Sequence, residues 1–438
     1  MSRKLLIKNG LVVCPSQNIE EKLDLLIIDD KIAEIKKEIK NSNIETLDAK
    51  GKIVTPGLVD MHCHLREPGR EDVATIQSGS KSAAAGGYTS IVCMANTNPI
   101  LDSRMGIEYI YFKGKDVGLI NIYPIGAVTT GLEGKELCEI ATLVEAGAVA
   151  ISDDENSITD SSLMRRALEY ITMFKIPLIT HCEDRYLSDA GCINEGLIST
   201  RLGFIGNPSI AEEIMVSRDI ILTKFTQSKL HIAHVTTKGS VDLIRQAKKN
   251  GVNITCEVTP HHLSLKDSDL LSSNYDTNLK VSPPLRGDED LKAITEGLKD
   301  GTIDVIATDH SPWLDMEKDV EFINAPYGII GFETAIPIIF EQLINTKQLS
   351  IKEAIAKLTC NPAKILNIPK GSLAIGSVAD ITIIDPNLKL TITEDFLHSI
   401  TKNTPFIGKN LKGFAVYTIV DGCIVYDRAK NSFFKKNL

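Results

Sequence analysis

Between residues 54 and 345, short apolar runs rich in β-branched residues alternate with longer amphipathic stretches. Polar, Gly or Pro residues bound each run, as is typical of buried strands that alternate with helices. The eight runs lie at residues 58–59, 89–93, 122–128, 149–152, 178–180, 230–235, 254–258 and 305–307. Eight such units over about 250 residues predict a (β/α)8 barrel, an α/β fold whose chemistry lies at the carboxyl ends of its strands.

The two flanks of this region have a different pattern. Residues 1–53 and 371–438 contain strand-like segments separated by Gly or Asp turns, such as KLLIKNGLVV and FAVYTIVDGCIVYD. Neither flank is long enough to bury a good core alone. We therefore predict that both flanks pair into one small β-sandwich beside a barrel of residues 54–370.

Histidine and aspartate residues stand at the ends of several apolar runs. His62 and His64 are two residues apart in DMHCHLREPG, so both rings can share one face of a strand. The other candidates are His181, His234, Asp309 and one of the adjacent pair Asp153 and Asp154. Zinc and related divalent ions accept imidazole and carboxylate ligands, and six such groups suffice for two ions. Any one histidine is as readily a hydrogen-bonded structural residue, but their joint placement at strand ends favours a metal site.

The remaining histidines are expected to have supporting roles. His231 precedes the second histidine of HIAHVT by three residues, so it faces away from it and is expected to be structural or to support a ligand. His261 and His262 either line the pocket or cap a loop. We expect His310 to hydrogen-bond around the site without ligating, and His398 to lie on the surface.

Composition narrows the class of protein. A hydrophobic content of 43% with 24% charged residues is ordinary for a soluble globular enzyme. The formal net charge of −9 and the absence of a long basic run argue against nucleic-acid binding. No apolar run reaches the roughly 18 residues of a membrane span, which predicts a cytoplasmic protein. The nine cysteines are odd in number and form no C-x-x-C pair, so a disulfide framework is not expected.

These motifs resemble the amidohydrolase superfamily and, within it, the bacterial type I dihydroorotases. The resemblance rests on DMHCHLREPGRED (60–72), MANTNP (94–99), ISDDEN (151–156), THCED (180–184), HIAHVT (231–236), NLKVSPPLR (278–286), ATDHSP (307–312) and APYGIIGFET (325–334). It implies one or two Zn2+ ions per subunit and reversible hydrolysis of the cyclic amide L-dihydroorotate to N-carbamoyl-L-aspartate in pyrimidine biosynthesis. A homodimer and an assembly with aspartate transcarbamoylase both stay open as partners.

The resemblance also assigns roles to individual residues. The implied metal ligands are His62, His64, Asp154, His181, His234 and Asp309, with Asp309 also the catalytic base. The implied substrate contacts are His64, Arg66, Asn96, Asn278, Tyr327 and Gly328. Residues 148–155 contain no lysine, so Asp154 stands where many relatives carry a carboxylated lysine.

The chain departs from the family pattern at two positions. Trp313 stands where a histidine usually helps to hold the substrate carboxylate, and Ser282 stands where an asparagine is common. An allantoinase or hydantoinase-type amidase is therefore the main alternative, although Arg66 favours a substrate that bears a carboxylate. A non-catalytic structural homologue is the third possibility, but such a protein would be expected to have lost some of the six ligands.

Overall fold

The strands of the middle region are parallel and follow the predicted apolar runs. The computed structural model describes residues 2–40 and 44–436. One three-stranded sheet contains β6 (Leu58–Cys63), β7 (Tyr88–Cys93) and β8 (Asn121–Pro124). A four-stranded sheet contains β9 (Leu178–Thr180), β12 (Leu230–Ile232), β13 (Ile254–Val258) and β14 (Val305–Ile306). All neighbours within these two sheets pair in parallel.

Isolated parallel bridges connect the two sheets at both ends. The predicted run at 149–152 is reduced to one bridging residue, Ile151, which pairs with Gly126 and with Leu178. On the other side, Cys63 at the end of β6 pairs with His310, just beyond β14. Parallel pairing therefore runs round a closed circuit of eight segments.

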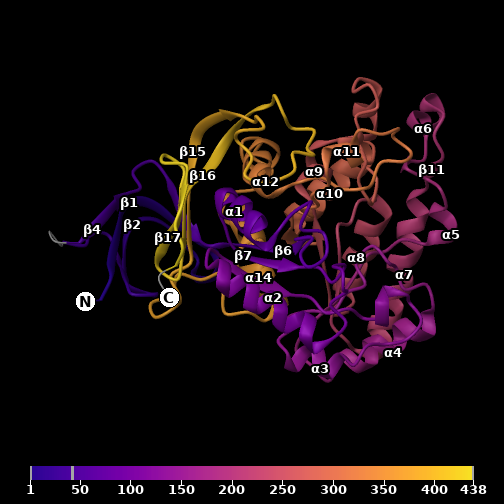
Figure 1. Cartoon of the computed structure of the whole chain (residues 1–438), viewed down its shortest axis with the longest axis horizontal. Coiled ribbons are helices and arrows are strands. Elements are labelled where there is room, and N and C mark those ends of the chain that lie inside the picture. Colours follow the sequence, from indigo (N-terminus) through magenta and orange to yellow (C-terminus); the bar gives the residue numbers. More distant parts are fainter. Residues whose placement is uncertain (1, 41–43, 437–438) are drawn as a thin grey trace.

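Helices lie between successive strands of this circuit and on its outer side (Figure 1). The longer ones are α1 (Ile76–Gly86), α2 (Arg104–Val117), α4 (Ser161–Ile171), α7 (Ser209–Thr226), α8 (Lys238–Lys249), α10 (Asp288–Asp300), α12 (Phe332–Ile339) and α13 (Ile351–Leu358). Shorter elements are α3 (Ile140–Glu145), α5 (Arg185–Ser188), α6 (Leu197–Leu202), α9 (Pro260–Ser264), α11 (Asp315–Lys318), α14 (Cys360–Leu366), β10 (Ile193–Asn194) and β11 (Gly206–Asn207). Local sequence sets their ends: Thr75 caps the first turn of α1, and Gly87 ends it with φ 93°.

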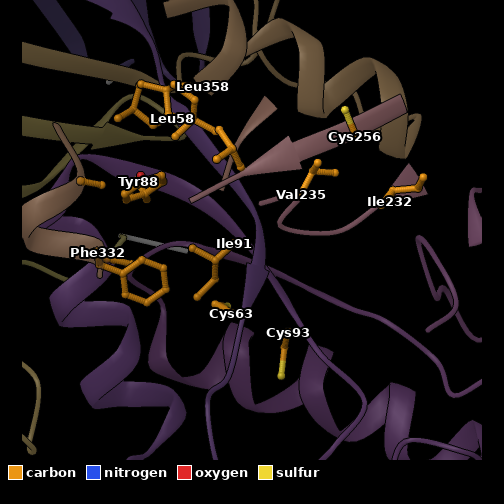
Figure 2. Packing of buried hydrophobic residues seen from close by; sticks show 14 of the residues in the cluster. Leu58, Cys63, Tyr88, Ile91, Cys93, Ile232, Val235, Cys256, Phe332 and Leu358 are labelled. Carbon is orange, nitrogen blue, oxygen red and sulfur yellow. The ribbon is translucent and has the colours of Figure 1, made fainter. Parts of the chain in front are cut away.

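Two apolar clusters hold the circuit together. In the larger, β6 and β7 pack against the surrounding helices, and Figure 2 shows Phe332 of α12 beside Ile91, with its ring centroid 5.6 Å from that of Tyr88. The smaller cluster takes residues from nearly every segment, including Val59, Val92 and Ile179, together with Ile365 and Leu366 of α14. Because residues from so many segments meet in this smaller cluster, it fills the space that the circuit encloses.

The two flanks pair with each other in one continuous nine-stranded sheet. Its order is β18-β17-β16-β15-β5-β1-β2-β3, with β4 paired to β1. The N-terminal strands are β1 (Lys4–Cys14), β2 (Ile19–Ile28), β3 (Lys31–Lys36), β4 (Glu45–Asp48) and β5 (Ile53–Pro56). The C-terminal strands are β15 (Ile381–Thr391), β16 (Asn410–Val420), β17 (Cys423–Asp427) and β18 (Ser432–Phe433). The antiparallel pairing of β5 with β15 joins the two flanks, and Figure 1 shows this sheet on one side of the parallel strands.

All nine cysteines are free thiols. Among the helices within residues 2–40 and 44–436, none is both long enough and apolar enough to span a bilayer.

Candidate metal centre

Four of the predicted ligands meet where β6 and the segment after β14 end. His62 Nε2 lies 3.5 Å from Asp154 Oδ1 and 3.7 Å from Asp309 Oδ1. His64 Nε2 lies 3.2 Å from Asp309 Oδ1. His62, His64 and Asp154 each offer a ligand atom, and these atoms lie within 4.8 Å of one another. All four side chains are buried, so a cation there would be shielded from bulk solvent.

The other two predicted ligands form a pair beside this group. His181 Nδ1 lies 3.1 Å from His234 Nε2, and the His234 ring centroid is 5.2 Å from that of His62. Two imidazole nitrogens at this distance need a shared proton or a shared cation between them. The fold therefore gathers all six predicted residues into one buried cluster; their assignment as ligands stays a prediction.

Unpartnered atoms and the local charges both fit a divalent ion. Asp154 Oδ2 and His234 Nδ1 are buried and form no hydrogen bond with any described residue. Burial opposes charge on His62, but hydrogen bonds to Asp154 and Glu257 outweigh it and raise the pKa of this imidazole. Burial also disfavours the charged form of Asp154, which raises its pKa. The charges of His64 and His62 outweigh burial and lower the pKa of Asp154 to about 2. In the absence of a metal, protons on the histidine rings offset the negative charge of the closely packed carboxylates. A divalent cation can take the place of those protons.

The backbone is unusual at four residues of this rim. Arg66, Asp154, His234 and Asp309 have φ values of 61°, 52°, 30° and 49°, a region that residues with a Cβ adopt rarely. Such backbone conformations turn a side chain away from the direction that regular strand geometry would give it. They cluster at functional sites, where the surrounding structure holds them.

Glu257 is a supporting residue that the sequence analysis missed. His62 Nδ1 lies 2.7 Å from Glu257 Oε1, and His231 Nε2 lies 3.3 Å from Glu257 Oε2. His231 Nδ1 in turn lies 2.8 Å from Thr255 Oγ1. His231 therefore supports the cluster through Glu257. This is the second of the two roles expected for it, support of a ligand rather than a purely structural role. The available signal was a glutamate inside the predicted buried strand ITCEV, where an unpaired charge would be costly.

The neighbouring acidic residue, Asp153, and one of the remaining histidines, His262, have structural contacts. Asp153 accepts hydrogen bonds from the amides of Val128 and Thr129. Its side chain therefore points away from the cluster and stabilises the loop that contains these two residues. The two ring nitrogens of His262 contact Thr259 Oγ1 and the Pro283 carbonyl. Of the two predicted roles, pocket lining and loop capping, these contacts favour loop capping.

His310 and His398 lie near α12. His310 Nδ1 accepts the Gly331 amide, and its ring stacks on Phe332. The surface assignment of His398 was wrong, because this side chain is largely buried and its Nδ1 lies 2.7 Å from Glu333 Oε1. The aromatic rings of the C-terminal strands cover it, a contact between elements distant in sequence.

Arg66 is held in a fixed orientation next to the cluster. Its Nε donates to the Pro312 carbonyl at 3.1 Å, and Nη2 donates to Ser311 Oγ at 2.7 Å. Its guanidinium carbon lies 4.4 Å from the centre of the Trp313 ring, a cation–π contact. The Trp313 indole N–H donates to the Tyr327 carbonyl at 2.6 Å, so it is committed to the protein. Trp313 thus orients Arg66 and has no free donor of its own.

Of the other predicted substrate contacts, Asn96 contacts the cluster and Gly328 lies beside Ser311. Asn96 Oδ1 lies 3.0 Å from His64 Nδ1, and the Asn96 amide N–H groups have no hydrogen-bond partner among the described residues. Asn278 Oδ1 is buried without a hydrogen-bond partner among the described residues. Gly328 has φ 109°, and a Cβ there would lie 2.5 Å from Ser311 Oγ, so only glycine fits.

Comparison with known proteins gives one consistent family. A family model described as Dihydro-orotase-like matches residues 51–240, and one described as Amidohydrolase family matches residues 231–426. The chain is 50% identical to a dihydroorotase of Acetivibrio thermocellus, over 96% of this chain and 98% of the relative. It is also 50% identical to a dihydroorotase of Geobacter metallireducens, over 97% of this chain and 100% of the relative.

Similar solved structures carry a different activity in their names. An L-hydantoinase (dihydropyrimidinase) from Arthrobacter aurescens superposes with TM-score 0.87 at 25% identity, covering 99% of this chain and 98% of that one. A dihydropyrimidinase from Brevibacillus agri superposes with TM-score 0.85 at 24% identity, covering 98% and 96%. These structures show the fold that the chain shares.

Proposed function

This chain belongs to the dihydroorotase family of amidohydrolases, and on that premise we propose that its buried histidine–aspartate cluster is a metal-dependent dihydroorotase site. The reaction is reversible hydrolysis of the cyclic amide L-dihydroorotate to N-carbamoyl-L-aspartate, a step of pyrimidine biosynthesis. The observation that carries the proposal is the convergence of six ligand residues next to Arg66, a guanidinium placed to bind a carboxylate. We further propose that the closed circuit of parallel strands is a (β/α)8 barrel of residues 54–370 and that the flanks form its accompanying β-sandwich.

The residues that would hold zinc form two groups. His62, His64, Asp154 and Asp309 lie close enough together to bind one ion, and His181 and His234 to bind a second beside it. A divalent ion held there would supply Lewis-acid chemistry, which would polarise the scissile carbonyl and make hydroxide available near neutral pH. Glu257 and Asn96 fix the rings of His62 and His64 through their Nδ1 atoms.

Asp309 is the proposed base and acid. Burial disfavours its charge, but its hydrogen bond to His64 and the charge of His62 hold its pKa below the usual range. The carboxylate is therefore free of a proton at neutral pH and can accept one from the attacking water. It then returns that proton to the ring nitrogen as the amide bond breaks.

Arg66 is the proposed anchor for the substrate carboxylate. A guanidinium has five N–H groups, and the hydrogen bonds to Pro312 and Ser311 use two of them. The two N–H groups of Nη1 and one of Nη2 have no acceptor in the part of the chain that the structure describes, which suits a bidentate contact with a carboxylate. The Trp313 ring fixes the plane in which this fork points.

One comparison of substrates tests the proposal against its alternative. Purified protein is offered dihydroorotate, N-carbamoyl-L-aspartate, allantoin and hydantoin, with metal content measured on the same preparation. The expected result is turnover of the first two, in opposite directions, by metal-loaded protein. Preference for an uncharged ring would instead assign the hydantoinase-type activity named for the similar structures.

A further inference from the structure

A buried lysine, Lys318, is the last residue of α11 and lies outside the metal cluster. Only 6% of its surface is exposed, and it forms no ion pair with a carboxylate in the part of the chain that the structure describes. Burial lowers the pKa of this side chain to about 7; the charges of Lys280 and Arg66 act in the same direction, and Asp276 opposes them. An ammonium group in such surroundings costs free energy that a methionine of similar length would not.

The Lys318 amine joins two segments that are distant in sequence. Its Nζ donates to the Thr277 carbonyl at 3.2 Å and to the Pro326 carbonyl at 2.8 Å. Thr277 Oγ1 in turn donates to the Lys318 carbonyl at 2.6 Å, so the contact with the first segment is reciprocal. The next residue in each segment is a predicted substrate contact, Asn278 in the first and Tyr327 in the second. Lys318 therefore holds the peptide group that precedes each of these two contacts.

The peptide group between Pro326 and Tyr327 shows the effect of this hold. A trans peptide group is planar, and its carbonyl and N–H point in opposite directions. A hydrogen bond that fixes the Pro326 carbonyl therefore also fixes the direction of the Tyr327 N–H. This N–H has no acceptor among residues 2–40 and 44–436, so it can donate to a ligand.

Other contacts keep the two segments together without Lys318. Lys280 Nζ donates to the Ile323 carbonyl at 2.8 Å and lies 4.6 Å from the centre of the Tyr327 ring. The Gly328 amide donates to the Lys280 carbonyl at 3.0 Å. Loss of the Lys318 donors should therefore release one peptide group in each segment but leave the segments packed against each other.

We propose that Lys318 is a positioning residue, which holds the Tyr327 N–H and the Asn278 segment in the orientation that binds the substrate. It acts through these two segments and does not touch the reacting atoms. The inference rests on the dihydroorotase activity proposed above. The amine has at least two N–H groups whether protonated or neutral, so both hydrogen bonds can form on either side of pH 7.

Steady-state kinetics separate positioning from a merely structural role. Contacts that hold substrate and transition state equally well affect KM, so Lys318→Met should raise KM for dihydroorotate about tenfold or more. Its kcat should change by less than about threefold. A structural role would instead lower the amount of folded enzyme, and with it the apparent kcat, while KM would stay unchanged.

Lys357→Met is the matched control. Lys357 is equally buried, with 6% of its surface exposed, and it too donates to a main-chain carbonyl, that of Ile303. Ile303 precedes β14 whereas Asp309 follows it, so this lysine lies at the opposite end of the strand from the cluster. Lys357→Met should therefore leave KM within about twofold of the wild-type value. Circular dichroism and metal content are measured on each variant.

Added amines test whether the N–H groups are the cause. Lys318 lines a cavity of about 280 Å3 together with Thr277 and Asn278, so Lys318→Ala leaves a space that a small amine can reach. Ethylammonium should restore most of the KM lost in this variant. Tetramethylammonium has the same charge and no N–H group, so it should restore little.

The outcomes distinguish this inference from the proposed function. An active wild type whose KM is unchanged in Lys318→Met overturns the role of Lys318 alone. Equal rescue of Lys318→Ala by the two cations does the same, since charge and not hydrogen bonding would then be the cause. A wild type that does not turn over dihydroorotate overturns the proposed function, and this inference with it.

Discussion

Replacing Arg66 with alanine should impair dihydroorotate hydrolysis far more than hydrolysis of an uncharged ring. The guanidinium is held by Pro312, Ser311 and Trp313, so its free edge points in a fixed direction before substrate arrives. Alanine removes this edge and leaves the substrate carboxylate without its cationic partner. A lysine at this position would keep the charge but lose the fork and the stacking contact.

The magnitude follows from the hydrogen bonds that are lost. A bidentate contact supplies two charge-assisted hydrogen bonds, each contributing about 1.5–3 kcal/mol. Together they amount to about 3–6 kcal/mol, or a fall in kcat/KM for dihydroorotate of roughly 10² to 10⁴. Hydantoin has no carboxylate, so its kcat/KM should change by less than about tenfold.

The assay compares kcat/KM for dihydroorotate and hydantoin in wild type, Arg66→Ala and Arg66→Lys, with metal content and circular dichroism as controls. Trp313→Phe keeps an aromatic ring under the guanidinium, whereas Trp313→Ala removes a contact of about 0.5–2 kcal/mol, so only the alanine variant should raise KM clearly. Equal losses on both substrates in Arg66→Ala would refute the role of Arg66 as the carboxylate anchor.

Four further predictions concern the metal, its supporting residues and a buried lysine. Chelation should abolish activity and added Zn2+ should restore it; full activity in protein shown to be metal-free would contradict this. Asp309→Asn should fold normally and lose about 100-fold or more in turnover, and a wild-type rate would exclude Asp309 as the base. Glu257→Gln should weaken metal binding by about 10- to 100-fold, measured by competition with a chelating dye, whereas unchanged affinity would make Glu257 purely structural. Burial lowers the pKa of Lys318 to about 7, and the unfolded chain holds this proton up to about pH 10.4. Between those values the unfolded state binds more protons, so this lysine makes folding more favourable as pH rises. The free energy of urea unfolding of wild type relative to Lys318→Met should therefore increase from pH 7 to 10, by up to about 1.4 kcal/mol per pH unit, and parallel curves for the two proteins would contradict it.

The sequence by itself determined the periodic elements and the chemistry at their ends. Seven of the eight apolar runs became parallel strands, because a buried strand needs β-branched side chains on both faces and this need is visible locally. Side chains at strand ends share one edge of a parallel sheet, so the grouping of His62 with Asp309 followed from their positions alone. The run at 149–152 does not form a strand, and only Ile151 pairs with the segments on either side. The extent of this pairing depends on the neighbouring segments, which the run itself does not reveal.

Only the tertiary structure decided contacts between segments distant in sequence. Glu257 stands 195 positions from His62, and Trp313 is 247 positions from Arg66, yet both pairs touch. The same holds for His398, which aromatic residues of the C-terminal strands bury. The positive φ angles of Asp154 and Asp309 could not be predicted either. Aspartate is common in ordinary turns, so its presence alone does not indicate this backbone conformation. Local pattern reports what each segment requires of its own backbone, whereas a side chain's partner is set by how the segments pack together.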